Sequence, residues 1–230
     1  DNFLERKIDK PAGPKLSPVF SPDGKNIAYR GRLYHEEWVG WRNIYLWLVP
    51  VKGGKAINLT ESFDRSFEAM ALDDLGHYSV TRPMFSRDEA YIYDITAEGG
   101  DCSLYRIDIK KRSVMKRVGS NEKVYAFDYD GKNTFALAIS NPTDPGNLFM
   151  LKDNVRKQLT QLNKNYLKIR RLSAPEEFRW RGHGGDEIQG WLLKPPNFRP
   201  DKKYPLIVQI HGGPHAAYGN SLFHEFQVLA

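Results

Sequence analysis

A tight turn followed by a strand of alternating apolar and polar residues recurs along the first 160 residues, and this repeat constrains the fold more than any other feature. Its first copy contains the turn Ser-Pro-Asp-Gly. In that turn Pro22 fixes φ, Asp23 accepts backbone hydrogen bonds and Gly24 supplies a positive φ. Ile27 and Tyr29 then alternate with polar neighbours, which predicts a strand with one buried face.

Three copies of this unit are visible, each with four strand-like stretches, and their spacing is about the blade length of a β-propeller. We therefore interpret residues 1–171 as a partial β-propeller of about three blades. A β-sandwich of similar hairpins is the alternative, but a sandwich does not require the same internal order in every copy. Closed propellers typically have four or more blades, so we expect the chain to be part of something longer. The copies lie at 17–32 with 43–60, 82–96 with 103–118, and 124–140 with 147–160, and a long insertion at 61–80 stretches the first interval.

The character of the chain changes over residues 172–230. Two strand-like stretches, EEFRWR and EIQGWLLKP, flank the turn GHGGDE and predict a hairpin. After a polar loop, PLIVQIHG at 205–212 is an apolar strand typical of a sheet covered on both faces. Leu222, Phe223, Phe226 and Leu229 then predict one apolar helix stripe, capped by Asn220 or Ser221. This order predicts the start of an α/β domain after a mainly β region.

Charge and composition exclude several classes of function. The net charge is +6, but Lys and Arg are spread along the chain, whereas a nucleic-acid footprint clusters on one element. We therefore expect no nucleic-acid partner. No apolar run approaches the length that crosses a bilayer, so we expect no membrane span either. The single cysteine, Cys102, rules out an internal disulfide framework and favours a reducing, cytoplasmic compartment.

The second part of the chain resembles a known family. The stretches EIQGWLLKP, YPLIVQIHGGPH and FHEFQVLA are similar to the start of the catalytic domain in the prolyl oligopeptidase family of serine peptidases, above all its acylaminoacyl-peptidase-like and dipeptidyl-aminopeptidase-like branch. The resemblance implies an N-terminal β-propeller followed by an α/β-hydrolase domain. It also implies hydrolysis of short or N-acylated peptides through a serine acyl-enzyme, with the propeller restricting access. It implies no cofactor.

His-Gly-Gly at the end of an apolar strand suits acyl transfer. Backbone N–H groups aimed at the developing oxyanion lower the barrier, and in α/β-hydrolases one of them comes from the loop after the third strand. By resemblance Gly213 offers that N–H, while Gly212, His211 and Pro214 shape the loop. Glycine there lets the backbone approach the substrate closely.

The rest of the catalytic machinery is absent from the sequence. The nucleophile elbow needs Gly-x-Ser-x-Gly, followed in the chain by Asp and then His. No such motif occurs in these 230 residues, and His224 precedes any position that a nucleophile could take. We therefore expect the chain alone to be inactive, with Ser, Asp and His supplied beyond Ala230.

Three other groups of residues contain site-forming residue types but lack the sequence context that a site requires. His211 and His215 have a His-x-x-x-His spacing, but Pro214 and the glycines make a turn where zinc binding needs a helix, so we expect no metal. Cys102 has no evident histidine partner and is expected to be a structural thiol. Asp73 and Asp74 lack a third carboxylate at EF-hand spacing, and a solvated loop is expected there.

A further substrate-binding candidate is the pair Glu36 and Glu37. Dipeptidyl peptidases of the resembling family hold the substrate's free ammonium with two propeller glutamates. A paired carboxylate between Tyr34 and Trp38 could bind such a cation, partly through the aromatic faces. An ordinary acidic hairpin loop is the alternative.

The sequence leaves more than one function open. A fragment of a serine peptidase acting on short peptides is favoured, with the remainder of the hydrolase domain as its partner. A non-catalytic propeller scaffold explains the missing triad but not the glycine loop. An esterase of the same fold is a third option, disfavoured by Pro214 and the preceding blades. Endopeptidase, acylaminoacyl-peptidase and dipeptidyl-peptidase specificity are not separated, and self-association into a homo-oligomer is left open.

Overall fold

The computed structural model describes residues 8, 13–34, 42–68, 70–74, 81–213 and 216–230. The fold is mainly β, with two short helices among the described residues. The strands and helices are β1 Lys15–Phe20, β2 Asn26–Gly31, β3 Tyr45–Pro50, β4 Ile57–Asn58, β5 Met84–Phe85, β6 Tyr91–Glu98, β7 Asp101–Asp108, β8 Val114–Val118, β9 Lys123–Tyr129, β10 Thr134–Asn141, β11 Asp144–Lys152, β12 Val155–Gln158, α1 Lys164–Lys168, β13 Glu176–Arg181, β14 Glu187–Leu192 and α2 His224–Leu229.

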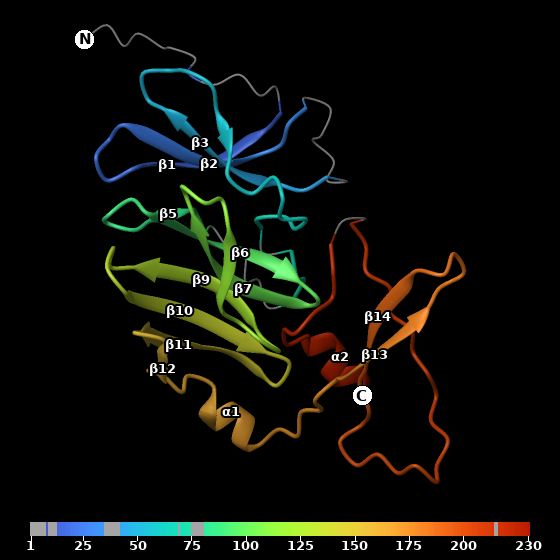
Figure 1. Ribbon diagram of the computed structural model, residues 1–230. Helices are drawn as coiled ribbons and strands as arrows, with labels where there is room; N and C mark the ends of the chain where they lie inside the picture. The colour runs from blue at the N-terminus through green and yellow to red at the C-terminus, as the bar shows by residue number, and fades with distance from the viewer. Residues whose placement is uncertain (1–7, 9–12, 35–41, 69, 75–80, 214–215) are drawn as a thin grey trace, which may run out of the picture.

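The first twelve strands form three antiparallel units of four strands each. We call them blade 1 (β1–β4), blade 2 (β5–β8) and blade 3 (β9–β12). Figure 1 shows the three blades succeeding one another from the N-terminus downward. Blades 2 and 3 are joined into one eight-stranded sheet by a parallel pairing of Cys102 on β7 with Lys123 on β9. The repeat predicted from the sequence is therefore confirmed as blades, although no closed propeller forms among the described residues.

The turn that recurs in the sequence has the predicted geometry in blade 1. Gly24 has φ 71°, and its N–H donates to the carbonyl of Ser21 at 2.9 Å. The carboxylate of Asp23 accepts from the Ser21 hydroxyl and from the N–H of Lys25. These local bonds hold the pKa of Asp23 far below its usual range, with Lys25 as the largest cause. The turn therefore sets the register of β1 against β2, as Asx-type turns do.

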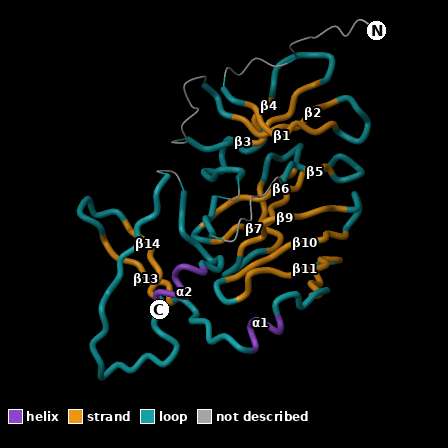
Figure 2. The backbone as a smooth tube through the Cα atoms, turned by 180° about the vertical axis from the view of Figure 1, so that it is seen from behind, coloured by secondary structure: helices purple, strands orange, loops and turns teal. Residues whose placement is uncertain are grey.

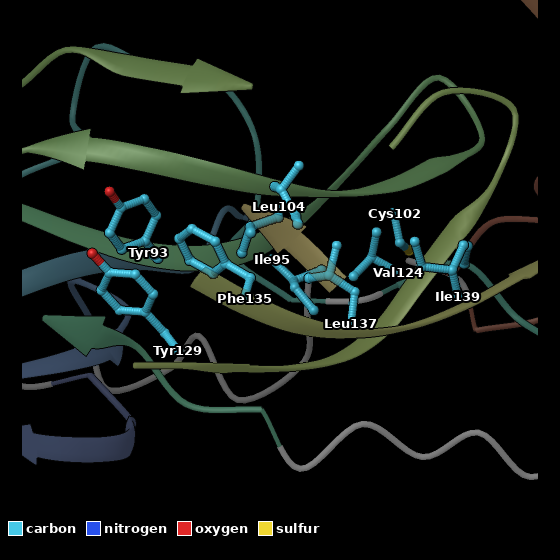
Figure 3. Close-up of a cluster of buried hydrophobic side chains, with 11 residues drawn as sticks. Tyr93, Ile95, Cys102, Leu104, Val124, Tyr129, Phe135, Leu137 and Ile139 are labelled. Carbon is cyan, nitrogen blue, oxygen red and sulfur yellow. The ribbon is translucent and has the colours of Figure 1, made fainter. Parts of the chain in front are cut away.

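Apolar side chains fill the spaces between neighbouring blades. On β7, Cys102 and Leu104 face blade 3 while Tyr105 and Ile107 face blade 1, as the two-residue period of a strand requires. Blade 2 is therefore buried on both faces. The cluster between blades 2 and 3 (Figure 3) contains Tyr93, Ile95, Cys102, Leu104, Val124, Tyr129, Phe135, Leu137 and Ile139, with Ala71 and Leu151.

The hairpin predicted around GHGGDE is β13 paired with β14. Gly185 adopts φ 85°, and the N–H of Gly182 donates to the carbonyl of Asp186 at 2.8 Å, which closes the turn. The hairpin docks on the β6–β7 turn of blade 2. There Gln189 donates to the carbonyl of Gly99 at 2.9 Å, and Trp191 packs so close to Gly100 that a Cβ on Gly100 would lie 2.4 Å from the indole.

The apolar strand expected at 205–212 is not formed. This segment runs as an extended loop away from the blades in both views (Figures 1 and 2). Its side chains are exposed, with 76% of Leu206, 70% of Val208 and 84% of Ile210 open to solvent. A strand needs a hydrogen-bonding neighbour, and β13 and β14 pair only with each other among the described residues. The apolar pattern predicts that this segment is buried, but no described element covers it.

The helix predicted from Asn220 or Ser221 is shorter than expected. α2 begins at His224, and Phe223 precedes it with no side-chain cap. Asn220 and Ser221 are instead buried, and their side chains bond to Asp101 and to the carbonyl of Leu72. In Figures 1 and 2, α2 lies between the blades and the β13–β14 hairpin. Among the described helices, none has the length and apolar character that a bilayer crossing requires.

Candidate oxyanion loop

The glycine loop expected to hold an oxyanion lies at the end of the exposed apolar segment. We call His211, Gly212 and Gly213 the oxyanion loop; all three are exposed. Gly213 has φ 141°, and a Cβ on Gly212 would meet nothing within 4 Å. Among the described residues, no hydrogen bond uses the backbone N–H of Gly213. In the part of the chain that the structure describes, the loop therefore combines open space with a backbone donor that has no acceptor. Pro214 and His215 lie outside the described residues.

Aromatic rings connect the oxyanion loop to α2. The rings of His211 and Tyr218 are nearly perpendicular, with a centroid distance of 5.7 Å. Tyr218 in turn meets Phe223 at 5.2 Å and Phe226 at 5.1 Å, both nearly perpendicular. Phe223 and Phe226 stack at 4.4 Å. Edge-to-face and offset pairs of this kind are favourable beyond the area they bury, so the four rings form one packed path.

Blade 2 holds the segment between the loop and α2. The N–H of Asn220 donates to the carbonyl of Gly100 at 2.7 Å, and its side-chain amide donates to Asp101 at 2.7 Å. Gly219 packs against Gly100 so tightly that a Cβ on Gly219 would lie 2.1 Å from the Gly100 carbonyl oxygen. Only glycine fits this approach.

The insertion between blades 1 and 2 forms a second set of contacts with the same segment. Ala71 pairs with Ala217 in a parallel bridge, and the N–H of Leu72 donates to the Ala217 carbonyl at 2.8 Å. The Ser221 hydroxyl donates to the Leu72 carbonyl at 2.6 Å. The segment after the oxyanion loop is thus hydrogen-bonded on two sides by blade 2 and the insertion.

The expected solvated loop is wrong for Asp73, whose carboxylate is buried, whereas Asp74 is exposed as expected. The carboxylate of Asp73 is buried and forms an ion pair of 2.5 Å with Lys123, whose ammonium also donates to the Ala71 carbonyl at 2.8 Å. Asp74 accepts from the backbone N–H of His224 at 2.8 Å and of Glu225 at 2.7 Å. Both carboxylates therefore have assigned partners within the fold.

The remaining candidates have different outcomes. Glu36, Glu37 and Trp38 lie outside the described residues. The face of the Tyr34 ring carries the guanidinium of Arg42 at 5.3 Å from its centroid, so this ring already has a cation. Cys102 is buried, and burial raises the pKa of its thiol to about 11, which disfavours the reactive thiolate. No group of metal-ligating side chains is found among the described residues.

Comparison with known proteins finds relatives that are similar over most of this chain. No protein-family model matches it. An uncharacterized peptidase, YuxL, from Bacillus subtilis is 32% identical over 187 residues, which are 80% of this chain and 28% of the relative. Dipeptidyl-peptidase 5 from Trichophyton schoenleinii is 28% identical over 218 residues, covering 91% of this chain and 28% of the relative. The chain therefore spans less than a third of the length of these curated relatives.

Solved structures share the fold. The acylaminoacyl peptidase of Pyrococcus horikoshii superposes with a TM-score of 0.72 at 22% identity, covering 94% of this chain and 30% of that one. An acylaminoacyl peptidase in complex with Z-Gly-Gly-Phe-chloromethyl ketone gives 0.71 at 23% identity, covering 90% and 29%. The named relatives are peptidases and the solved structures share the fold, which is consistent with the resemblance to the prolyl oligopeptidase family that the sequence predicts.

Proposed function

We propose that this chain belongs to a serine peptidase that hydrolyses short or N-acylated peptides, and that it supplies the oxyanion loop and part of a gating propeller. Ser, Asp and His would come from polypeptide beyond these 230 residues, since the sequence contains no Gly-x-Ser-x-Gly. The chain alone would then be inactive.

The observation that carries this proposal is the state of Gly213. Its N–H has no acceptor among the described residues, and the neighbouring Gly212 faces open space. A backbone donor that folding has left unpaired is costly when buried and useful when a substrate oxygen can reach it. A loop of this kind suits a site where a carbonyl oxygen gains negative charge.

The proposed reaction follows from that donor. The serine oxygen attacks the peptide carbonyl carbon, its proton passes to histidine, and the carbonyl oxygen becomes an oxyanion held by Gly213 N–H and a second donor. The C–N bond then breaks as histidine protonates the leaving amine. Water repeats the sequence on the acyl-enzyme and releases the acid.

The exposed apolar segment at 204–210 supports a partner for this chain. Leu206, Val208 and Ile210 leave most of their surface in water, and their backbone has no strand beside it among the described residues. Exposed apolar patches of this kind mark interaction sites. We propose that the remainder of the hydrolase domain pairs with this segment and completes a sheet.

Specificity for a free N-terminus is assigned to Glu36 and Glu37 as part of the proposal. Two adjacent carboxylates can hold an ammonium group, and the relative from Trichophyton schoenleinii is named a dipeptidyl-peptidase. Glu36→Gln with Glu37→Gln should raise KM for free-amine substrates and leave KM for N-acylated substrates unchanged.

The test uses the full-length protein that carries this chain. It is assayed with three chromogenic substrates: an N-acetylated alanine p-nitroanilide, a dipeptide p-nitroanilide with a free amine, and a p-nitrophenyl ester. Hydrolysis of either anilide supports the peptidase proposal, and the preferred anilide reveals which N-terminus is accepted.

Two results would overturn the proposal. Hydrolysis of the ester alone would favour an esterase. A folded protein that cleaves none of the three substrates would favour the non-catalytic propeller scaffold.

A further inference from the structure

We propose that Asp74, in the insertion between blades 1 and 2, is a positioning residue for the oxyanion loop and acts on it through α2. This inference rests on the proposed function, because it concerns the geometry of the loop that would hold the oxyanion. It assigns to the propeller part of the chain a direct role in organising that loop, in addition to restricting access.

Asp74 supplies a cap that α2 lacks in its own sequence. Phe223 precedes the helix and makes no side-chain cap bond. The Oδ1 atom of Asp74 accepts from His224 N–H at 2.8 Å, and Oδ2 accepts from Glu225 N–H at 2.7 Å. Both carboxylate oxygens are therefore used on the first two backbone donors of the helix. Bonds from N–H groups to a carboxylate are short and strong, and a negative charge at a helix N-terminus is favourable.

α2 has few other reasons to form. It contains six residues, none of them fully buried, and an isolated helix of that length is unstable in water. Among its own residues, Gln227 makes further long-range contacts: its amide nitrogen donates to the carbonyls of Ser173 at 2.8 Å and Pro142 at 3.3 Å, and its oxygen accepts from Ser173 N–H at 2.8 Å. The start of α2 is thus held by Asp74 and the end by Gln227.

The position of α2 determines the position of the ring path to the oxyanion loop. Phe226 lies on the first turn of α2 and stacks on Phe223, and both rings pack against Tyr218. Tyr218 contacts His211, the residue next to Gly212. Packed rings have discrete arrangements rather than a continuous range. Loss of the cap would therefore loosen Phe226, then Tyr218, then the loop.

Asp74 is exposed, but the three residues before it are anchored to the blades and to the segment after the oxyanion loop. Its neighbour Asp73 is paired with buried Lys123 at the start of β9, and Ala71 is part of the apolar cluster between blades 2 and 3. Leu72 is bonded to Ala217 and Ser221. A carboxylate on such a support can transmit the geometry of the blades to α2, whereas one on an unanchored loop could not.

Loss of a residue that positions the oxyanion loop and loss of a residue that only stabilises the fold should have different effects on kcat and KM. An oxyanion donor acts mainly in the transition state, so a displaced loop lowers kcat while KM stays nearly constant. Complete removal of an oxyanion donor costs roughly 10²–10³ in kcat. A loop that is loosened but still present should lose about tenfold, below that range.

The experiment compares variants of the full-length protein that carries this chain. Asp74→Asn keeps the size of the side chain but replaces one acceptor oxygen with a donor amide, and Asp74→Ala removes both acceptors. The matched control is Asp130→Ala. Asp130 also accepts backbone N–H bonds, from Lys132, Asn133 and Thr134, but in the β9–β10 turn. Each variant is measured for kcat and KM on the p-nitroanilide that wild type hydrolyses fastest, and for amide hydrogen exchange of peptides covering 204–213 and 216–230.

The inference predicts that both Asp74 variants lose about tenfold in kcat, keep KM within about twofold and exchange faster in both peptides. Asp130→Ala should keep wild-type kcat and exchange in those peptides. If wild type is active and the Asp74 variants match Asp130→Ala, the inference is wrong and the proposed function stands. If wild type hydrolyses no anilide, the proposed function fails first and the positioning role fails with it.

Discussion

The guanidinium of Arg30 on β2 forms an ion pair with the carboxylate of Asp94 on β6, and both groups are buried between blades 1 and 2. Arg30 also donates to the Thr81 hydroxyl at 3.0 Å, and the N–H of Ile95 donates to Asp94 at 2.8 Å. Burial raises the pKa of Asp94, while Arg30 opposes that shift. The pair joins two blades whose other contacts are largely apolar.

Breaking this pair on one side should be strongly destabilising. Asp94→Ala leaves the Arg30 guanidinium buried without its carboxylate, and such a loss costs about 3–5 kcal/mol of unfolding free energy. The double variant Arg30→Met with Asp94→Leu should lose much less, because no unpaired charge remains. Urea unfolding of both variants measures the difference. Equal losses would show that the charge pair is not the cause.

The Gly99–Gly100 turn offers a sharper test of how the hairpin docks on blade 2. Both residues have positive φ, 59° and 90°, so alanine strains either one. A Cβ on Gly99 meets nothing within 4 Å, whereas one on Gly100 collides with Trp191. Gly99→Ala should cost about 1 kcal/mol, and Gly100→Ala should cost clearly more. Hydrogen exchange of β13 and β14 should rise only in Gly100→Ala, and equal exchange in the two variants would argue against this docking.

Shortening a side chain in the cluster between blades 2 and 3 should lower the free energy of unfolding. Leu104 is fully buried there, so Leu104→Ala should cost about 2–5 kcal/mol through lost burial and a residual cavity. Leu148 on β11 is nearly half exposed and serves as the control. Its replacement by alanine should cost about 1 kcal/mol or less, since nearly half of its surface stays in water in the folded state. Thermal or urea unfolding distinguishes the two, and similar losses would contradict the assigned core.

Asp130 should contribute to the free energy of unfolding in a way that is lost at acid pH. Backbone N–H groups, with Thr134 the largest cause, hold the pKa of Asp130 at about 2, below its ordinary 3.8. A lowered pKa in the folded state means that the contribution is present above about pH 4 and is lost as pH falls toward 2. Asn in its place cannot titrate. Wild type should exceed Asp130→Asn in urea midpoint at pH 6 and match it at pH 2, and a constant gap would contradict the assignment.

Local sequence was sufficient where one short segment determines the structure. The turns at Ser21 to Gly24 and at Gly182 to Asp186 are each closed by hydrogen bonds between residues close in sequence, and both were predicted correctly. The contacts that fix the oxyanion loop are of another kind. Asp74 caps a helix 150 residues away, and nothing in the sequence around either position indicates the other. The segment 205–212 shows a third case, because an apolar pattern predicts burial without naming the element that provides it.

The residues of the oxyanion loop could be proposed from the sequence, but their contacts with α2 could be found only in the structure. The role of His211 to Gly213 stays a prediction, made from their residue types and from a family resemblance. The ring path through Tyr218 could not be foreseen, because the aromatic spacing of Tyr218, Phe223 and Phe226 suits an ordinary apolar helix face equally well.

The central claim is that this chain contributes an oxyanion loop to a serine peptidase whose nucleophile lies elsewhere. Fluorophosphonate labelling of the full-length native protein, followed by mass spectrometry of tryptic peptides, tests it most directly. The account predicts one labelled serine within a Gly-x-Ser-x-Gly motif outside these 230 residues, with every serine of this chain unlabelled. A folded protein that takes up no label, or a label on a serine of this chain, would contradict it.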